Sequence, residues 1–452
     1  MPARLINSLA TTEPLAEIFA DDSVLQTMLD FEVALARAEA RVGIVPKSAA
    51  ETISAVARAS EFDIPALSRA MFRAGTAGIP LVKALTENVR ARDQEAAGWV
   101  HWGATSQDVA DTALILLLKR AYPILANDLQ RLEKSLVKLS EQHKATVMLG
   151  RTLMQPAPPI TFGLKAAGWL GALHRGTKRF KSACDEALVL QFGGASGTLA
   201  SLGDKGIVVA HALAEELGLS CPEAPWHTHR DRLANLVCCC GILTGSLGKM
   251  ARDISLLMQT EVGEVAEPGG EGRGGSSTMP HKRNPIACSL TLSAAQQSPA
   301  LVASFLSAMV QEHERAVGSW QSEWPVVASI VQLTGMAAAS MTEVAEGLTV
   351  HAERMQQNIE KTKGLIFAER AMMLLAQKLG RDVAHKLLED ATCQSIAQNK
   401  RLSAVLRELP EVASHIDHSA LEQLEIPEQY LGSAEAFREA LLSCCTQKNR
   451  ER

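Results

Sequence analysis

Residues 233–257, LANLVCCCGILTGSLGKMARDISLL, carry the pattern that decides the fold. Apolar side chains recur there at alternating spacings of three and four residues: Leu233, Leu236, Cys240, Leu243, Leu247, Met250, Ile254 and Leu257. This spacing places them along one side of an α-helix about seven turns long. Such an apolar seam is unstable in water, so it predicts a long helix packed nearly parallel or antiparallel to partner helices.

An earlier stretch repeats the spacing of this seam, with Leu125, Leu129, Leu132, Leu136 and Leu139. The first seam also contains Gly241, Gly245 and Gly248, although a glycine inside a helix costs about 1 kcal/mol relative to alanine. We therefore expect neighbouring helices to approach closely at these glycines, in part from other copies of the chain. Pro123 and Pro299 lie in otherwise helical stretches and are expected to kink or restart them.

The remaining segments indicate an all-α protein. Residues 27–42 predict an amphipathic helix that ends at Gly43. No alternating strand pattern of convincing length is present, and the short apolar run 187–190 fits either a strand or a helix end. We expect three domains: an N-terminal helical domain at 1–112, a central long-helix bundle at 113–360, and a small helical domain at 361–452.

Composition narrows the range of functions. The 452 residues carry 45 Lys and Arg against 50 Asp and Glu, a net charge of −5, so nucleic acid is not expected as the main partner. There is no apolar leader and no apolar run of the roughly 18 residues that a membrane span needs, so no membrane partner is expected. Nine scattered cysteines without a CxxC framework predict reduced thiols, a cytoplasmic protein and no zinc. No nucleotide-binding glycine motif is present.

Three polar stretches adjoin the predicted long helices: HWGATSQDVADT at 101–112, GRTLMQPAPPITFG at 150–163 and EGRGGSSTMPHKRNPIA at 271–287. The third combines glycines and serines with a basic cluster between two prolines. Hydroxyls, cations and an amide in one segment suit a site that binds carboxylates and moves a proton. The plainer alternative is a basic surface loop. In the first stretch, Thr105, Ser106 and Asp108 could cap a helix as well as contact a substrate.

Read together, GSSTMPHKRNP, HWGATSQDVADT and GRTLMQPAPPITFG resemble the fumarase/aspartase superfamily, over nearly the whole chain and in the same order. The resemblance implies a homotetramer whose core contains twenty long helices, five from each copy. Each active site would combine the three motifs from three different copies, with no metal and no organic cofactor.

The resemblance also implies roles for individual residues. Ser276, or its neighbour Ser277, would be the catalytic acid/base on a flexible loop, and Lys282 would complete the catalytic set. The substrate-binding set would be His101, Thr105, Ser106, Arg151, Gln155, Met279, His281, Arg283, Asn284 and Arg315. Structural ion pairs are the alternative for Arg283 and Arg315, and for Arg315 the two roles are equally compatible with the sequence.

Two departures from the superfamily pattern suggest which reaction to expect. Lyases of the superfamily usually have a histidine where Leu153 stands and a glutamate where Ser289 stands, and the two form a relay. Leucine cannot titrate, so a working C–N lyase is disfavoured. The pattern resembles the lactone-forming cycloisomerase branch instead, which implies a small tricarboxylate substrate from aromatic catabolism. His313 is a candidate proton donor in place of Leu153. An adenylosuccinate lyase-like enzyme and a non-catalytic structural relative are the alternatives.

Overall fold

The computed structural model describes residues 4–270, 274–275, 278–279 and 282–446. Of residues 445 and 446 it describes the backbone only. The described chain divides into two compact units. Unit 1 contains residues 1–130, 175–248 and 290–340, and unit 2 contains residues 131–174, 249–289 and 341–452. Each unit is described by itself below, and the predicted three-domain division stays a prediction.

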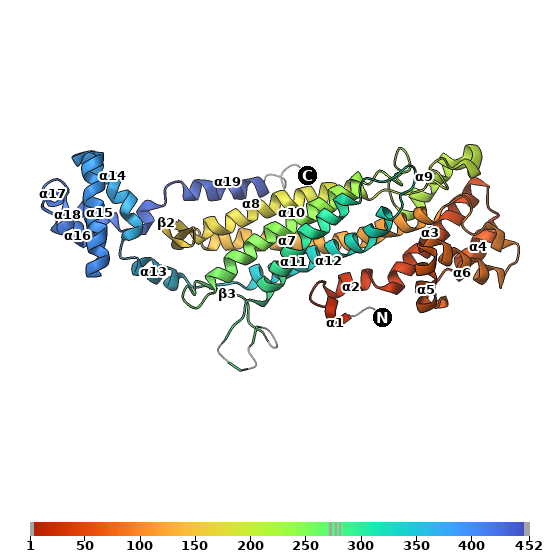
Figure 1. Cartoon of the computed structure of the whole chain (residues 1–452), viewed down its shortest axis with the longest axis horizontal. Helices are drawn as coiled ribbons and strands as arrows, with labels where there is room; N and C mark the ends of the chain where they lie inside the picture. Colours follow the sequence, from red (N-terminus) through yellow and green to blue (C-terminus); the bar gives the residue numbers. More distant parts are fainter. Residues whose placement is uncertain (1–3, 271–273, 276–277, 280–281, 447–452) are drawn as a thin grey trace. The chain divides into compact units, whose positions relative to one another are not determined.

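The N-terminal part of unit 1 is a set of short and medium helices around an apolar core (Figure 1). Their bounds are α1 Arg4–Asn7, α2 Glu13–Ile18, α3 Asp21–Val42, α4 Lys47–Val56, α5 Ile64–Ala74 and α6 Gly78–Arg90. Helix α9, Gly206–Leu217, packs on α3. The predicted end of α3 is confirmed, because Gly43 adopts a left-handed φ of 75° there. The helix begins six residues before the predicted Thr27, with Asp21 and Asp22 in its first turn.

The described residues include five long helices: α7 Ser106–Gln142, α8 Phe162–Ala187, α10 Asp231–Leu257, α11 Ile286–Ser307 and α12 Ser319–Gly347. Helices α7 and α10 carry the two predicted seams. Both apolar seams are buried throughout. Pro123 and Pro299 each lie inside a continuous helix, so the expectation that they might restart their helices is wrong. Within unit 1 the helices contact one another directly; Thr244 of α10 and Thr334 of α12, for example, share a hydrogen bond of 2.9 Å.

Close approach of a neighbouring helix was predicted at all three seam glycines, and the structure shows it at two of them. A Cβ on Gly241 would lie 2.6 Å from Val302 of α11, and one on Gly248 would lie 2.5 Å from Ala295 of the same helix. Both distances are far shorter than a van der Waals contact, so only glycine lets α10 and α11 pack this closely. Gly245 is exposed and meets nothing within 4 Å among the described residues.

Unit 2 contains a β-hairpin where the sequence predicted only a polar loop. Strand β1 spans Val147–Thr152 and pairs antiparallel with β2, Gln155–Thr161, with an irregularity after Leu149. The strand pattern escaped detection because three prolines interrupt β2; in a two-stranded ribbon their missing N–H groups can face away from the ladder. A second, two-residue pair joins β3, Val265–Ala266, to β4, Thr349–Val350.

The remainder of unit 2 is helical, as predicted. The helices are α13 Ala352–Lys361, α14 Ala368–Leu379, α15 Arg381–Gln398, α16 Leu402–Glu408, α17 Pro410–Ala413, α18 His418–Leu424 and α19 Ala434–Thr446. Their apolar core includes Leu375, Leu402 and Leu406, and it is extended by Val147 and Leu149 of β1. The fold is therefore all-α with one substantial hairpin.

Helices α10 and α12 are long and apolar enough to cross a membrane by length and composition alone. Their most apolar windows are 61% and 67% buried within the chain, which is also what core helices of a globular protein show. In α10 the apolar residues of the seam are buried, so packing accounts for its apolar character.

Candidate active site

The first motif folds around Asp108, a fully buried carboxylate in the first turn of α7. It accepts hydrogen bonds from the backbone N–H groups of Thr105 at 3.0 Å, Gly193 at 3.0 Å and Gly194 at 2.9 Å. His227 Nε2 lies 2.7 Å from the same side chain. Asp108 therefore orients the site, because a carboxylate that holds three N–H groups fixes the backbone around it.

Arg315 joins the first motif to the turn at residues 193–197. Its guanidinium donates to Thr105 Oγ1 at 2.9 Å and to the carbonyl oxygens of Gly194 at 3.3 Å and Ala195 at 3.0 Å. Among the residues that the structure describes, Arg315 pairs with no carboxylate, so the alternative of a structural ion pair gains no support. Thr105 and Arg315, two of the predicted substrate-binding residues, are thus brought into contact.

A buried ion cluster holds the segment that carries Arg315. The guanidinium of Arg230 pairs with Asp111 at 2.7 Å and with Glu323 at 2.5 Å, and all three side chains are fully buried. Trp320 Nε1 donates to Asp111 at 2.9 Å, and Gln311 Nε2 donates to Glu323 at 2.7 Å. Removing one member would leave an uncompensated buried charge, so the cluster rigidly fixes residues 311–320 next to α7.

His101 occupies a strained position one turn before Thr105. Its φ is 60°, in the left-handed region that a non-glycine residue seldom adopts. Nδ1 lies 2.7 Å from Glu32 Oε1 of α3, and the Glu32 side chain is fully buried. Burial lowers the pKa of His101, but Glu32, with a smaller contribution from Asp108, more than offsets it, so the pKa is raised overall.

The second motif forms the tip and one strand of the hairpin in unit 2. Arg151 makes a bidentate ion pair with Glu264, at 2.9 Å and 2.6 Å, and Asn358 donates to the same carboxylate at 2.8 Å. The charge of Arg151 is therefore already neutralised, and its predicted role as a counter-charge gains no support. Gln155 is exposed and pairs with Thr152 beside the turn.

The third motif lies partly outside the described residues: Ser276, Ser277 and His281 are not among them. Lys282, Arg283 and Met279 are exposed. Two contacts hold the ends of this segment together. Asn284 N donates to Gly274 O at 2.9 Å, and Glu267 accepts from Ala287 N at 3.1 Å and from Cys288 N at 2.9 Å. Glu267 thereby occupies the positive N-terminus of α11, so this helix end is not free for a substrate carboxylate.

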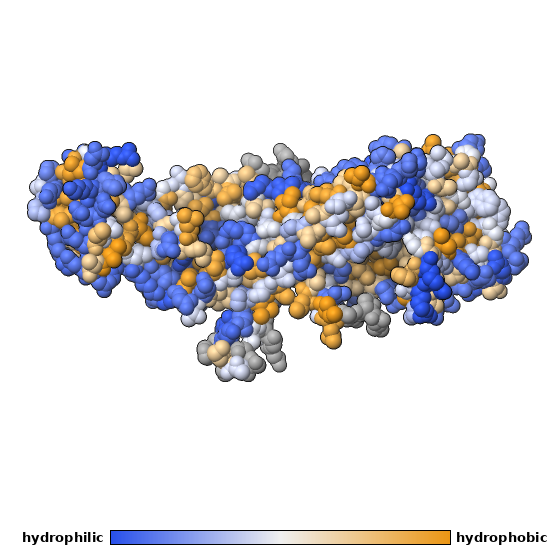
Figure 2. Space-filling view, viewed as in Figure 1, coloured by the Kyte–Doolittle hydropathy of each residue, from blue (hydrophilic) through white to orange (hydrophobic). Residues whose placement is uncertain are grey.

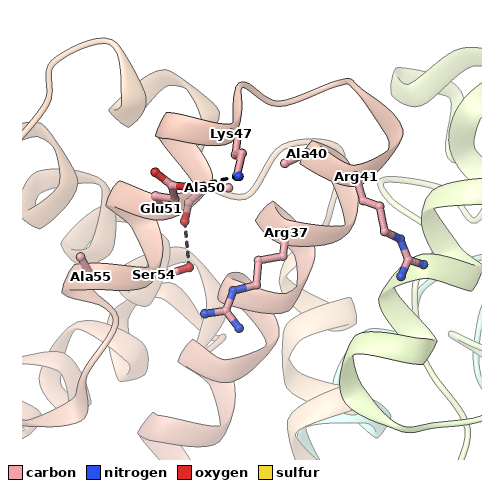
Figure 3. Close-up of a pocket in the computed structure, with 8 residues that line it drawn as sticks. All are labelled: Arg37, Ala40, Arg41, Lys47, Ala50, Glu51, Ser54 and Ala55. Atoms are coloured by element: carbon pink, nitrogen blue, oxygen red, sulfur yellow. Dashed lines mark hydrogen bonds and ion pairs between the residues drawn. The ribbon is translucent and has the colours of Figure 1, made fainter.

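A separate hollow of about 580 Å³ lies in unit 1 between α3 and α4 (Figure 3). Arg37, Arg41 and Lys47 line it, but Arg41 pairs with Glu215 at 2.6 Å and Lys47 lies 3.9 Å from Glu51. None of the predicted site residues lines this hollow. The hollow is open, and two of its three basic side chains already lie beside a carboxylate. We therefore do not include it in the site.

Sequence reasoning missed Glu32, Glu39, Glu264 and Glu267. A signal for the first two was present: carboxylates seven residues apart sit on the apolar face of the predicted 27–42 helix. Such residues are normally excluded from a core unless they are paired or protonated. Both residues are at most 1% exposed.

Comparisons with known proteins identify the class of protein that this fold and these motifs define. The family model for lyases matches residues 8–298, and the model for the adenylosuccinate lyase C-terminus matches residues 364–441. The chain belongs to this lyase family, the fumarase superfamily.

Particular relatives are more specific. The chain is 50% identical to a 3-carboxy-cis,cis-muconate cycloisomerase of Bradyrhizobium diazoefficiens over 93% of this chain and 94% of that protein. It is 48% identical to the protein of the same name from Pseudomonas aeruginosa over 97% and 96%. The crystal structure of 3-carboxy-cis,cis-muconate lactonizing enzyme from Pseudomonas putida matches with a TM-score of 0.91 and 46% identity, over 97% of this chain and 98% of that one. The resemblance drawn from the motifs is confirmed.

Proposed function

We propose that the chain is a cycloisomerase that converts 3-carboxy-cis,cis-muconate to a carboxymuconolactone in protocatechuate catabolism. The observation that carries the proposal is near-full-length identity of about half to relatives of that name. Leu153 and Ser289 support it, because the His–Glu relay of the lyases is missing. Ser289 instead donates its hydroxyl to Pro285 O at 2.7 Å.

The reaction is an addition within one molecule. An oxygen of one substrate carboxylate forms a bond to a carbon of a double bond, and a proton is added to the carbon next to another carboxylate. Negative charge builds on that second carboxylate as an enolate-like species, so preorganised positive donors lower the barrier. Since nucleophile and alkene belong to the same substrate, the enzyme mainly has to fold the substrate and place its three carboxylates.

The residues divide this work by their charge and exposure. His101, Thr105 and Arg315 form one group in unit 1, in which Arg315 keeps its charge and His101 has a raised pKa. Lys282, Arg283 and Asn284 form the other group, and the exposed Lys282 is our choice for the main cation near the reacting carboxylates. Ser276 or Ser277 would transfer the proton. Arg151 is left with a positioning role through Glu264.

We also propose that the working form is a cytoplasmic homotetramer whose sites combine residues from several copies. Large apolar side chains are exposed in the single chain, among them Val310 at 84%, Val317 at 86% and Ile207 at 72%. Figure 2 shows hydrophobic areas, in orange, on the surface as well as the expected polar ones. Exposed apolar area of this kind is typical of surfaces that pair with another protein.

A substrate comparison tests the function. The purified chain is incubated separately with 3-carboxy-cis,cis-muconate and with adenylosuccinate while the ultraviolet absorbance is followed. We expect loss of the muconate absorbance only. Turnover of adenylosuccinate alone would favour the C–N lyase alternative, and turnover of neither would favour the non-catalytic relative.

A further inference from the structure

Two glutamates of α3 lie in the apolar interior of unit 1, and only one of them has a partner. Glu32 and Glu39 are seven residues apart on the same side of the helix, among buried residues such as Leu35 and Ala36. Glu32 Oε1 contacts His101 at 2.7 Å. Glu32 Oε2 and both oxygens of Glu39 have no hydrogen-bond partner among the described residues.

The two carboxyl groups differ in their surroundings. Burial, and next the negative charge of Glu32, raise the pKa of Glu39 to about 9, so Glu39 carries a proton at neutral pH. Glu32 has the histidine beside it, and a fully buried carboxylate is tolerated when it is paired. Of the two carboxyl groups, Glu32 is therefore the one that can act on a neighbouring side chain, through its 2.7 Å contact with His101.

His101 has one nitrogen held and one open. Nδ1 is taken by Glu32, and Nε2 has no hydrogen-bond partner among the described residues. The side chain is 15% exposed, so the open nitrogen is within reach of a ligand. A histidine ring fixed through Nδ1 by a carboxylate presents Nε2 in one orientation and favours the imidazolium form.

We propose that Glu32 is a positioning residue of the active site, which holds His101 as a charged hydrogen-bond donor whose Nε2–H binds a carboxylate of the substrate. This inference rests on the proposed function for the identity of the ligand, but not for the Glu32–His101 pair itself. No proton is transferred in this step. The charged groups that face His101 are Glu32 of α3 and Asp108 of α7. Asp108 is already bound to three N–H groups and His227, so Glu32 is the group that holds the ring.

The pair explains the strain at His101. A left-handed φ of 60° at a histidine persists only when the surroundings enforce it. The 2.7 Å contact with Glu32 supplies such an anchor from a different element of the fold. The strained backbone thus holds the His101 ring beside Glu32 and leaves Nε2 of the ring accessible.

The test combines kinetics with a measurement that needs no turnover. In Glu32→Gln, the fall of kcat/KM for 3-carboxy-cis,cis-muconate at alkaline pH should begin about one pH unit or more lower than in the unaltered chain, because the amide no longer favours the imidazolium. The expected loss of kcat/KM is therefore larger at pH 8 than at pH 6. Glu39→Gln is the matched control: the same helix, the same burial and the same change, with an amide replacing a carboxyl that is already neutral. Its profile should be that of the unaltered chain.

Histidine-selective ¹³C labelling gives the second readout, with the His101→Gln variant identifying the His101 signal among 12 histidines. His101 should titrate above the ordinary histidine value of about 6.5 in the unaltered chain and below that position in Glu32→Gln. The proposal is overturned if the titration is the same in both, or if it shifts while the kinetic profile does not.

Two further outcomes are covered by the same design. If Glu32→Gln does not fold, an ordinary titration of His101 in the unaltered chain would be enough to refute the inference. If the unaltered chain does not convert the muconate, the proposed function fails, while the NMR titration still decides whether Glu32 governs His101.

Discussion

At the scale of single residues, the charge of Lys282 gives the sharpest kinetic test of the proposed site. Lys282 is exposed, and unlike Arg151 it forms no ion pair within the part of the chain that the structure describes. We expect Lys282→Met to lower kcat/KM for 3-carboxy-cis,cis-muconate by about 100-fold or more, the typical loss for one donor that stabilises a developing oxyanion. Lys47→Met is the control, since that side chain is 88% exposed and lies outside the site. A change of less than threefold in Lys282→Met would remove it from the catalytic set.

Glu39 predicts how stability depends on pH. The folded chain keeps a proton on Glu39 up to a pKa of about 9, whereas the unfolded chain loses it near the ordinary value of 4.5. Between these values the folded state binds more protons, so the free energy of unfolding falls as pH rises, by roughly 1 kcal/mol per pH unit from this group. Glu39→Gln should remove that part of the decline.

Urea unfolding at pH 6, 7, 8 and 9 measures this effect. The stability difference between Glu39→Gln and the unaltered chain should grow steadily in favour of the variant across the series. Glu51→Gln, an exposed change on the neighbouring helix α4, should show no such growth. A constant difference for Glu39→Gln would mean that Glu39 does not carry the extra proton.

Among the individual residues, roles that depend on neighbours in the sequence were predictable, whereas pairings between residues far apart in the sequence were not. Capping of the helix was one role expected for Asp108, and its bond to the N–H of Thr105 at the start of α7 agrees with that role. The bidentate partner of Arg151, Glu264, lies more than a hundred positions away, and no local pattern reveals such a pairing. The only sequence signal for Glu32 and Glu39 was their position as charged residues on the apolar face of a predicted helix.

At the scale of elements, the turn of the hairpin is the least expected feature. Leu153 and Met154 form its two-residue loop, and their φ values of 49° and 67° are both positive, as in a type I′ turn. Asn-Gly is the usual sequence for such a turn. A positive φ costs leucine and methionine about 1 kcal/mol or more each, so these residues are rarely found in such a turn. The sequence Leu-Met therefore gives no signal for a hairpin.

The strain predicts a trade between stability and activity. Replacing Leu153-Met154 by Asn-Gly should raise the free energy of unfolding by about 1–2 kcal/mol, because the new residues adopt a positive φ readily. Thermal unfolding measures the gain. Ala157→Gly within β2 is the control and should destabilise the chain by about 0.5–1 kcal/mol.

The same double variant should be slower on the muconate if the tip contacts substrate in the assembled enzyme. Unchanged turnover with raised stability would show that the tip has no part in the reaction. Unchanged stability would contradict the assignment of strain to the turn itself.

Helices α7 and α10, by contrast, could be predicted from the sequence, because apolar residues recur at spacings of three and four from Leu125 to Leu139 and from Leu233 to Leu257. Gly241 and Gly248 even indicated where α10 would meet a neighbour. Periodicity says nothing about which helix the neighbour is, and it cannot reveal whether a proline restarts a helix. Pro123 is accommodated within α7, and the pattern around it is helical in either case.

At the scale of the whole molecule, a site built from several copies makes a prediction that no single chain can satisfy. Lys282→Met and His101→Gln should each be nearly inactive alone. Mixed after gentle dissociation and reassembly, they should recover a measurable part of the activity, because some sites then receive both unaltered residues from different copies. Mixing two preparations of the same variant is the control.

The mass of the assembly provides the independent check. Light scattering should give about four times the chain mass of 48.5 kDa. A monomer with full activity would contradict both the proposed tetramer and the shared site. Recovery of activity without a tetramer would keep the shared site and change only the number of copies.

The exposure of the hairpin tip has a consequence for how enzymes of this kind diversify. Leu153 is 96% exposed and Met154 71% exposed in the single chain, so neither contributes to the interior that holds the chain together. Two adjacent codons can therefore be exchanged with little danger to folding, and one of them is the codon at which related lyases encode histidine. A lineage can thus explore a different reaction there while the remainder of the architecture is inherited intact.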